Sequence, residues 1–236
     1  MKVILHTGNG EQFLLTGSRL STNVAAPESA LLQLVGSSTR SDMRIPGRPG
    51  VLAGDKNYQP IDVEIPFYLM AYTADEMEDV HRRFRQGWRG ARFEIQADHP
   101  LSPLFLDVDD FSLPGVQVDV AKRRALTISV RIFSASGLFS SEVLQGANNV
   151  TVTNDGDVDI FPTAKYTGNG GQVTNPSGAT WTLEPVTEET TVSFDPLKNR
   201  TPGVLSESIK PGASGVWKMP PGAQLFWTVQ VADPWA

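Results

Sequence analysis

The sequence predicts a mainly-β protein built of two β-sandwich or barrel-like domains, the first carrying a single packed α-helix at about residues 73–88. Three observations support this fold class. Short apolar stretches recur at 8–12-residue spacing in the C-terminal part, which is typical of sandwiches and jelly rolls. Glycine (21) and proline (17) are abundant while charged residues make up 19%, which favours turns over long helices. One segment alone has a convincing helical period.

The amino-acid composition of the chain changes near residue 145. The part before it contains the helix and most arginines, and the part after it is rich in Thr, Gly, Pro and Trp. At this change lies Asn154-Asp155-Gly156-Asp157, a tight-turn signal between a strand at 150–153 and a second strand beginning at 158. We therefore expect an N-terminal domain at 1–143 and a C-terminal domain at 144–236.

The N-terminal part begins with a predicted hairpin over residues 2–16. The apolar run 31–35 is interpreted as a buried strand. Residues 40–55 contain several Gly and Pro residues and read as a long loop of the kind that is functional or disordered. Residues 61–69 alternate strictly and form the clearest strand; Pro66 within it indicates a sheet edge or a bulge.

The helix begins at a capping box formed by Thr73 and Glu76. Acidic residues in its first turns and arginines in its last turn complement the helix dipole. Gly87 and Gly90 end it. Its apolar stripe consists of Met77, Val80, Phe84 and Trp88.

Later strands follow from alternation. Short strands are expected around 93–95 and 104–108, and a hairpin is predicted to pair 116–120 with 126–132. The C-terminal strands are expected at 150–153, 158–167, 172–174, 179–183, 190–194, 215–219 and 224–231.

Composition excludes several classes. There is no cysteine, so disulfides and thiolate metal sites are ruled out. The net charge of −6 argues against nucleic-acid binding. The N-terminal apolar run is too short for a secretory signal and no run reaches membrane-spanning length, so we expect a protein made in a cytoplasm and not bound to membrane.

Chemistry-bearing motifs are sparse. His81 has no Glu-x-x-His partner, and His99 reads as a loop residue. The segment 155–166 begins like a calcium loop but has Ile160 and Tyr166 where Gly and Glu are required. The sequence therefore predicts no catalytic, cofactor-binding or metal residues and no enzymatic activity. The acidic cluster 107–110 is interpreted as a solvated edge, with pairing to the arginines of a partner chain or weak cation binding as alternatives.

Two surface features leave alternatives open. Arg82 and Arg83 are assigned to a solvated helix face through pairs with Glu78 and Asp79, whereas Arg89 and Arg92 remain candidates for contact with a partner. The aromatic residues after 180 would suit sugar stacking, yet Trp181 and Trp217 lie within alternating strands, where burial is the default.

A family resemblance rests on ordered motifs: Asn154-Asp155-Gly156-Asp157, Phe161-Pro162, Tyr166-Thr167-Gly168, Val173-Thr174-Asn175-Pro176, Ser193-Phe194-Asp195 and Trp217 to Gly222. Their order, with a helix-bearing N-terminal half, is similar to that of distal tail proteins of long-tailed (siphovirus-type) bacteriophages. The resemblance covers most of the chain.

The resemblance implies a structural virion protein at the phage tail tip, made in the bacterial host cytoplasm. It implies a homohexameric ring formed by the N-terminal domains, with a tail tube protein on one side and a tail-tip hub protein on the other. It also implies a galectin-like C-terminal domain, although Ser177 after Asn175-Pro176 departs from the galectin sugar site.

We expect the subunit contact at the loop 40–58 and the strand 61–69, because edge strands can be covered by a neighbour in a ring. The candidate interface residues are Arg44, Arg48, Tyr58, Arg89 and Arg92. The rival functions are a carbohydrate-binding module or glycan-contacting adhesin, and a hydrolase with paired carboxylates.

Overall fold

The computed structural model describes residues 1–16, 23–115, 117–198 and 201–236. The described chain is mainly β, with long antiparallel ladders, which confirms the predicted fold class. It divides into two compact units: unit 1 is Met1–Phe139 with Ala232–Ala236, and unit 2 is Ser140–Val231. Within these residues, the helices are too short and too polar to cross a bilayer.

The predicted domains 1–143 and 144–236 are regions expected to fold independently. Independent folding is not tested by the structure, so this boundary stays a prediction. The division into units falls at 139/140, and the last five residues belong to unit 1. They are fixed there by hydrogen bonds from Gly36 N to Ala232 O (2.7 Å) and from Trp235 Nε1 to Leu34 O (3.1 Å). Two short strands, β13 (Phe139–Ser140) and β22 (Gln230–Val231), lie where the chain passes between the units.

The first sheet of unit 1 starts with the predicted N-terminal hairpin. It contains β2 (Gln12–Leu14), β1 (Lys2–His6), β9 (Arg92–Gln96) and β10 (Leu104–Asp107), in that order. Alternate residues of these strands, such as Val3, Leu5, Phe93 and Ile95, are buried. The period of two in the sequence thus gives the sheet one core face, although Ile4 on the opposite face of β1 is also buried.

The second sheet has the order β11 (Asp110–Ser112), β12 (Ala125–Ser134), β8 (Ile61–Met70) and β3 (Val24–Ala25). The register of β8 and β12 runs without a shift from Ile61↔Ser134 to Met70↔Ala125, so Pro66 causes no bulge. β3 pairs only with Tyr68 and Leu69. In the described chain β8 is therefore an edge along 61–67, as Pro66 predicts.

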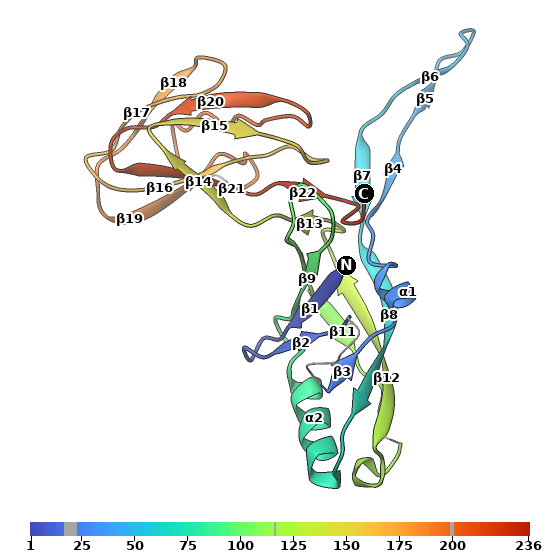
Figure 1. The fold of residues 1–236 in the computed structure, drawn as a ribbon. Helices are drawn as coiled ribbons and strands as arrows, with labels where there is room; N and C mark the ends of the chain where they lie inside the picture. Colours follow the sequence, from blue (N-terminus) through green and yellow to red (C-terminus); the bar gives the residue numbers. More distant parts are fainter. Residues whose placement is uncertain (17–22, 116, 199–200) are drawn as a thin grey trace. The chain divides into compact units, whose positions relative to one another are not determined.

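The long helix α2 (Ala74–Gln86) follows β8 (Figure 1). Thr73 caps it by accepting a hydrogen bond from Glu76 N at 3.2 Å, and the predicted apolar stripe is buried. Trp88, at the end of this stripe, packs among aromatic rings from both sheets and from the helix. Their centroids lie 5.3 to 6.4 Å from the Trp88 ring: Phe67, Phe84, Phe93 and Phe111.

Two predictions for unit 1 were wrong. The run 31–35 is not a strand: a short helix, α1 (Glu28–Leu31), begins after Pro27, and Leu31 and Leu34 are buried at a helical spacing of three. The predicted hairpin 116–132 does not form, because β12 pairs with β11 and β8. Residues 120–122 instead form the 3₁₀-helix η1 (Val120–Lys122), which contacts α2, and Val116 lies outside the described residues.

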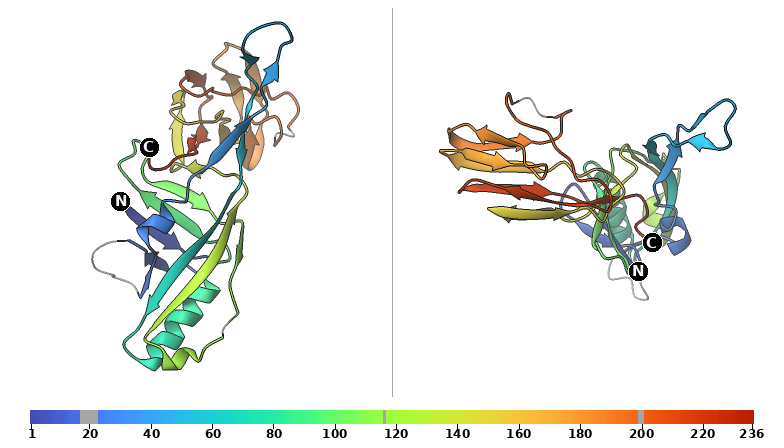
Figure 2. Two further views of the ribbon diagram at one scale, coloured as in Figure 1. Left: turned by 90° about the vertical axis from the view of Figure 1, so that its right-hand side faces the viewer. Right: turned by 90° about the horizontal axis from the view of Figure 1, so that it is seen from above.

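Unit 2 contains two four-stranded sheets, which appear as stacked layers in Figure 2. The first is β14 (Leu144–Ala147), β21 (Ala223–Trp227), β16 (Thr163–Gly168) and β19 (Val186–Ser193). The second is β15 (Asn149–Thr153), β20 (Ser214–Lys218), β17 (Gly171–Thr174) and β18 (Thr180–Leu183). All seven expected C-terminal strand regions contain a strand, and β14 is an addition.

The turn at 154–157 joins strands of different sheets, since β15 pairs with β20 whereas β16 pairs with β19 and β21. The buried Asn154 fixes this turn. Its Nδ2 donates to Val158 O (2.8 Å) and to Ile209 O (2.7 Å), and its Oδ1 accepts from Gly156 N (3.0 Å). The turn signal in the sequence therefore marks the passage from one layer of the sandwich to the other.

Candidate subunit interface

Residues 37–59 form a two-stranded ribbon that we call the arm, so the prediction of a loop at 40–55 was wrong. Its base is β4 (Ser37–Arg40) paired with β7 (Lys56–Gln59), and its outer part is β5 (Met43–Arg44) paired with β6 (Val51–Leu52). Figure 1 shows the arm projecting beyond the sheets of unit 1 from the start of β8. At roughly 3.3 Å per residue, its ten residues from base to turn span about 30 Å.

Glycines shape the arm at its middle and at its end. Between the two ladders, Gly54 N donates to Asp42 Oδ1 at 3.0 Å, and a Cβ on Gly54 would lie 2.1 Å from the carbonyl oxygen of Ser41. At the end of the arm, Gly47 and Gly50 have φ of +76° and +90°, which favours glycine. The Gly and Pro residues that suggested a loop thus belong to the turn of a long hairpin.

The outer part of the arm exposes aliphatic side chains. Met43 (65% exposed) and Leu52 (58%) are cross-strand partners on one face, and Val51 (52%) lies on the other face opposite Arg44. Ile45 is 41% exposed. Sequence reasoning missed these four residues, although apolar residues on both sides of the turn 46–50 were the signal that could have found them.

Three of the five predicted interface residues lie on the arm. Arg44 is in β5 and Arg48 is in the terminal turn; both are exposed, and neither side chain has a partner within the described part of the chain. Tyr58 is in β7, half-buried, opposite Ser38. Near the base, Arg40 pairs with Asp42 at 3.1 Å.

The structure places the other two predicted residues elsewhere in unit 1. Arg89 is exposed in the turn after α2. Arg92, in β9, pairs with Asp107 at 2.7 Å, and its guanidinium lies 5.1 Å from the ring centre of Phe105. The five predicted residues therefore form two separate groups, and their role in subunit contact stays a prediction.

Several charged groups of α2 pair within unit 1. Asp79 pairs with Arg83 at 2.7 Å as predicted, but Arg82 also pairs with Asp79 and not with Glu78. Arg83 also pairs with Glu11 at 3.2 Å. Burial lowers the pKa of Arg83, but the hydrogen bonds to Glu11 and Asp79 outweigh this effect, so its pKa is raised. Arg82 and Arg83 on this helix face thus form their salt bridges within unit 1.

The sugar-stacking reading of the C-terminal tryptophans does not hold for two of them. Trp181 and Trp217 are 6% and 0% exposed. Trp181 Nε1 donates to Asn175 Oδ1 at 2.9 Å, and its ring packs edge-on against Phe194. Both rings belong to the core between the two sheets of unit 2, and neither presents a face to a ligand.

The acidic stretch 155–159 is part of the layer-changing turn. Asp159 accepts from Lys210 Nζ (2.6 Å) and Ser208 Oγ (3.1 Å). Among the residues that the structure describes, no three His, Asp or Glu side chains are grouped so that they could hold a metal ion. The carboxylates of the acidic cluster 107–110 have different partners: Asp107 forms a salt bridge with Arg92, and Asp109 accepts a hydrogen bond from Ala135 N at 2.7 Å.

The fold and the arm define a class: a two-unit, mainly-β protein with an exposed two-stranded ribbon. No protein-family model and no curated protein matches the chain. Solved structures of phage proteins do match, and the three described below each match over nearly the whole of both chains.

The SPP1 Dit (gp 19.1) protein, described as a paradigm of the hub adsorption apparatus in phages that infect Gram-positive bacteria, is 12% identical with a TM-score of 0.55, over 97% of this chain and 98% of that chain. A chain of the phage P2 baseplate, activated with Ca, is 9% identical with a TM-score of 0.56, over 97% of each chain. A chain of the same baseplate activated with Sr is 9% identical with a TM-score of 0.55, over 96% of this chain and 97% of that chain. These likenesses confirm the fold that the resemblance to distal tail proteins predicts.

Proposed function

We propose that this chain is a structural virion protein at the distal end of a phage tail. Copies of it form a closed ring, six by the family resemblance, that joins the tail tube to the tail-tip or baseplate hub. The observation that carries the proposal is a fold shared over 97% of the chain with a distal tail hub protein. The proposal assigns the chain a role in assembly and no reaction.

The arm supports self-assembly on physical grounds. An isolated two-stranded hairpin is at best marginally stable in water, because it has no core. Within the arm, the outer strands are exposed on both faces; they carry three exposed aliphatic side chains, and Ile45 next to β5 adds a fourth. Clustered apolar side chains on an exposed ribbon mark a surface that another chain covers.

A contact between an arm and a different surface of the next copy is heterologous. Such contacts build a ring when the rotation closes and a filament when it does not. The matching structures are described as a hub adsorption apparatus and a baseplate, which supports the closed alternative for this chain. The tube protein and the hub protein are then the partners on the two sides of the ring.

The oligomeric state tests the proposal. We expect mass photometry and negative-stain imaging of the purified chain to show rings, either alone at high concentration or after addition of the tube protein encoded with it. The double variant Met43→Ser, Leu52→Ser should assemble poorly. Leu197→Ser is the matched control, because Leu197 is 91% exposed but lies in unit 2. A chain that stays monomeric under both conditions contradicts the proposal.

A further inference from the structure

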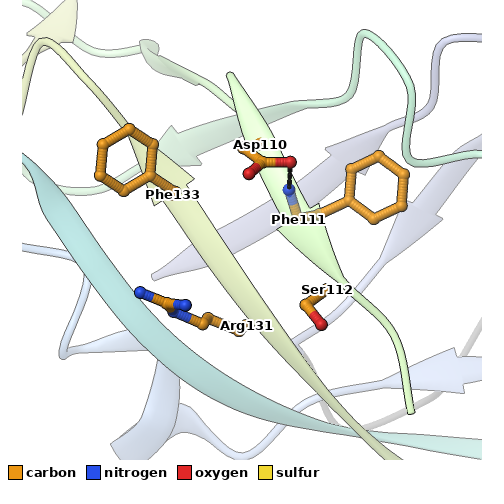
Figure 3. A pocket seen from close by; sticks show the side chains of 5 residues that line it. All are labelled: Asp110, Phe111, Ser112, Arg131 and Phe133. Atoms are coloured by element: carbon orange, nitrogen blue, oxygen red, sulfur yellow. Dashed lines mark hydrogen bonds between the residues drawn. The ribbon is translucent and has the colours of Figure 1, made fainter.

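Beside the edge strand β11, unit 1 has an open hollow of about 240 Å³ (Figure 3). It is lined by Asp110, Phe111, Ser112, Arg131 and Phe133. Typical small-molecule pockets hold roughly 300–1,000 Å³, so this hollow suits one or two side chains better than a free ligand. In Figure 3 the two aromatic rings lie on either side of Asp110.

The strand register shows what surrounds the hollow on the outer face of the sheet. Ser112 is opposite Arg131, which is opposite Glu64, and Asp110 is opposite Phe133, which is opposite Asp62. The outer face of these three strands therefore carries three carboxylates and one guanidinium. Arg131 is already committed to Asp62, by a hydrogen bond of 2.6 Å from Nε and a second from Nη2.

Two of these carboxylates remain available to a partner. Glu64 is exposed and has no side-chain partner in the described part of the chain. Asp110 is exposed and accepts from the backbone of its neighbour Phe111 (2.8 Å) through one oxygen. β11 also leaves one edge unpaired among the described strands. The surface is thus acidic, partly aromatic and open along a strand edge.

The arm has the complementary character. Arg40 and Asp42 of the arm pair with each other. The other charged residues of the arm are three basic ones and one acidic one, so the arm is basic: Arg44, Arg48, Lys56 and Asp55. Its aliphatic residues lie next to these arginines, as the Phe133 ring lies opposite Asp110 in the hollow. Charge and apolar character therefore match between the arm and the hollow.

A chain cannot place its own arm in its own hollow. The hollow lies where β8 starts, since Asp62 follows the arm by three residues, and the arm leads away from that point for about 30 Å (Figure 1). The occupant with the matching character must then come from another molecule.

We propose that the hollow beside β11 receives the end of the arm from a second copy of this chain, with Arg44 or Arg48 facing Asp110 and an arm aliphatic side chain against Phe133. This assignment rests on the proposed function and adds the receiving surface. The contact is heterologous, so each copy gives one arm and accepts one.

Cysteine cross-linking tests this directly, because the chain contains no cysteine. The variant Leu52→Cys, Ser112→Cys places one thiol on the arm and one in the hollow. Under an added oxidant, we expect a ladder of covalent oligomers in denaturing gels. Each single variant can give no more than a dimer. The matched control Leu52→Cys, Thr182→Cys pairs the arm with an exposed residue of β18 in unit 2 and should give no ladder.

Charge exchange gives a second readout. Asp110→Lys should weaken assembly about two- to fivefold, as expected for a partly exposed ion pair. Adding Arg44→Glu and Arg48→Glu to that variant should restore it, whereas Asp155→Lys in unit 2 should have no effect.

The outcomes separate the two proposals. Rings without an arm-to-hollow ladder, or a ladder equal to that of the control pair, overturn this inference and leave the proposed function standing. Absence of any oligomer, with or without the tube protein, overturns both.

Discussion

The backbone N–H of Gly54 donates a hydrogen bond of 3.0 Å to Oδ1 of Asp42, twelve residues earlier in the chain. This bond closes the gap between the inner and outer ladders of the arm, where the two strands are not paired. The arm has no core, so its straightness depends on local contacts of this kind. Its middle is therefore a sensitive point.

Gly54→Ala should disable the arm without unfolding the protein. The added Cβ would lie 2.1 Å from the Ser41 carbonyl oxygen, so the strands must separate there. We expect assembly to weaken by about tenfold or more, or about 1.4 kcal/mol, with the melting temperature unchanged because no core residue moves. Sedimentation velocity and calorimetry measure the two quantities. Ala53→Ser, next to it and exposed, should assemble normally; equal loss there would contradict the explanation.

Trp88→Ala should destabilise unit 1 strongly. Trp88 is 1% exposed and touches four aromatic rings, and removal of such a side chain costs about 3–5 kcal/mol. Urea unfolding measures the change. Trp88→Phe should cost less than half as much, because the buried Nε1 has no hydrogen-bond partner in the described structure. A similar cost for both variants would show that the indole nitrogen matters.

Glu76 should make stability depend on acid pH. Its pKa is lowered, first by the hydrogen bond from Tyr72 N (2.7 Å) and then by that from Asn23 Nδ2 (2.7 Å). A lowered folded-state pKa gives stability that is present above the ordinary value of 4.5 and is lost as pH falls through the folded value. The melting temperature of the parent chain should thus fall below about pH 4.5, and Glu76→Gln should show a smaller fall. Parallel pH profiles would refute this role.

Asn154→Ala should destabilise unit 2. The change leaves the Val158 and Ile209 carbonyls and the Gly156 N–H without their side-chain partner, at a cost of about 1–3 kcal/mol. Asn149→Ala, exposed in β15, should be nearly neutral. Circular dichroism in urea gives both values.

These two core variants also test the predicted domains 1–143 and 144–236. If the domains fold independently, calorimetry of the full chain resolves two transitions. Trp88→Ala then shifts one transition and Asn154→Ala shifts the other. A single transition that moves with either variant would mean that the chain folds as one cooperative unit.

Local patterns in the sequence determined much of the fold. The capping box at Thr73 and the stripe from Met77 to Trp88 locate α2, because a cap and a 3.6-residue period are properties of one segment. The alternation in 61–69 locates β8 for the same reason, as side chains of a strand alternate regardless of its partner. The turn at 154–157 was also predictable, because its Asn-Asp-Gly-Asp sequence is a local signal.

The partners of the strands, and the arm, were decided by tertiary structure. Residues 126–132 alternate in the same way whether they pair with 116–120 or with β8, so the pattern could not choose. The arm is locally rich in Gly and Pro, and its aliphatic residues have no period that distinguishes a ribbon from a loop. The hollow beside β11 joins residues 110–112 to 131–133, which only strand pairing brings together. Sequence alone thus determined which segments are strands or helix, and long-range pairing decided which surfaces they form.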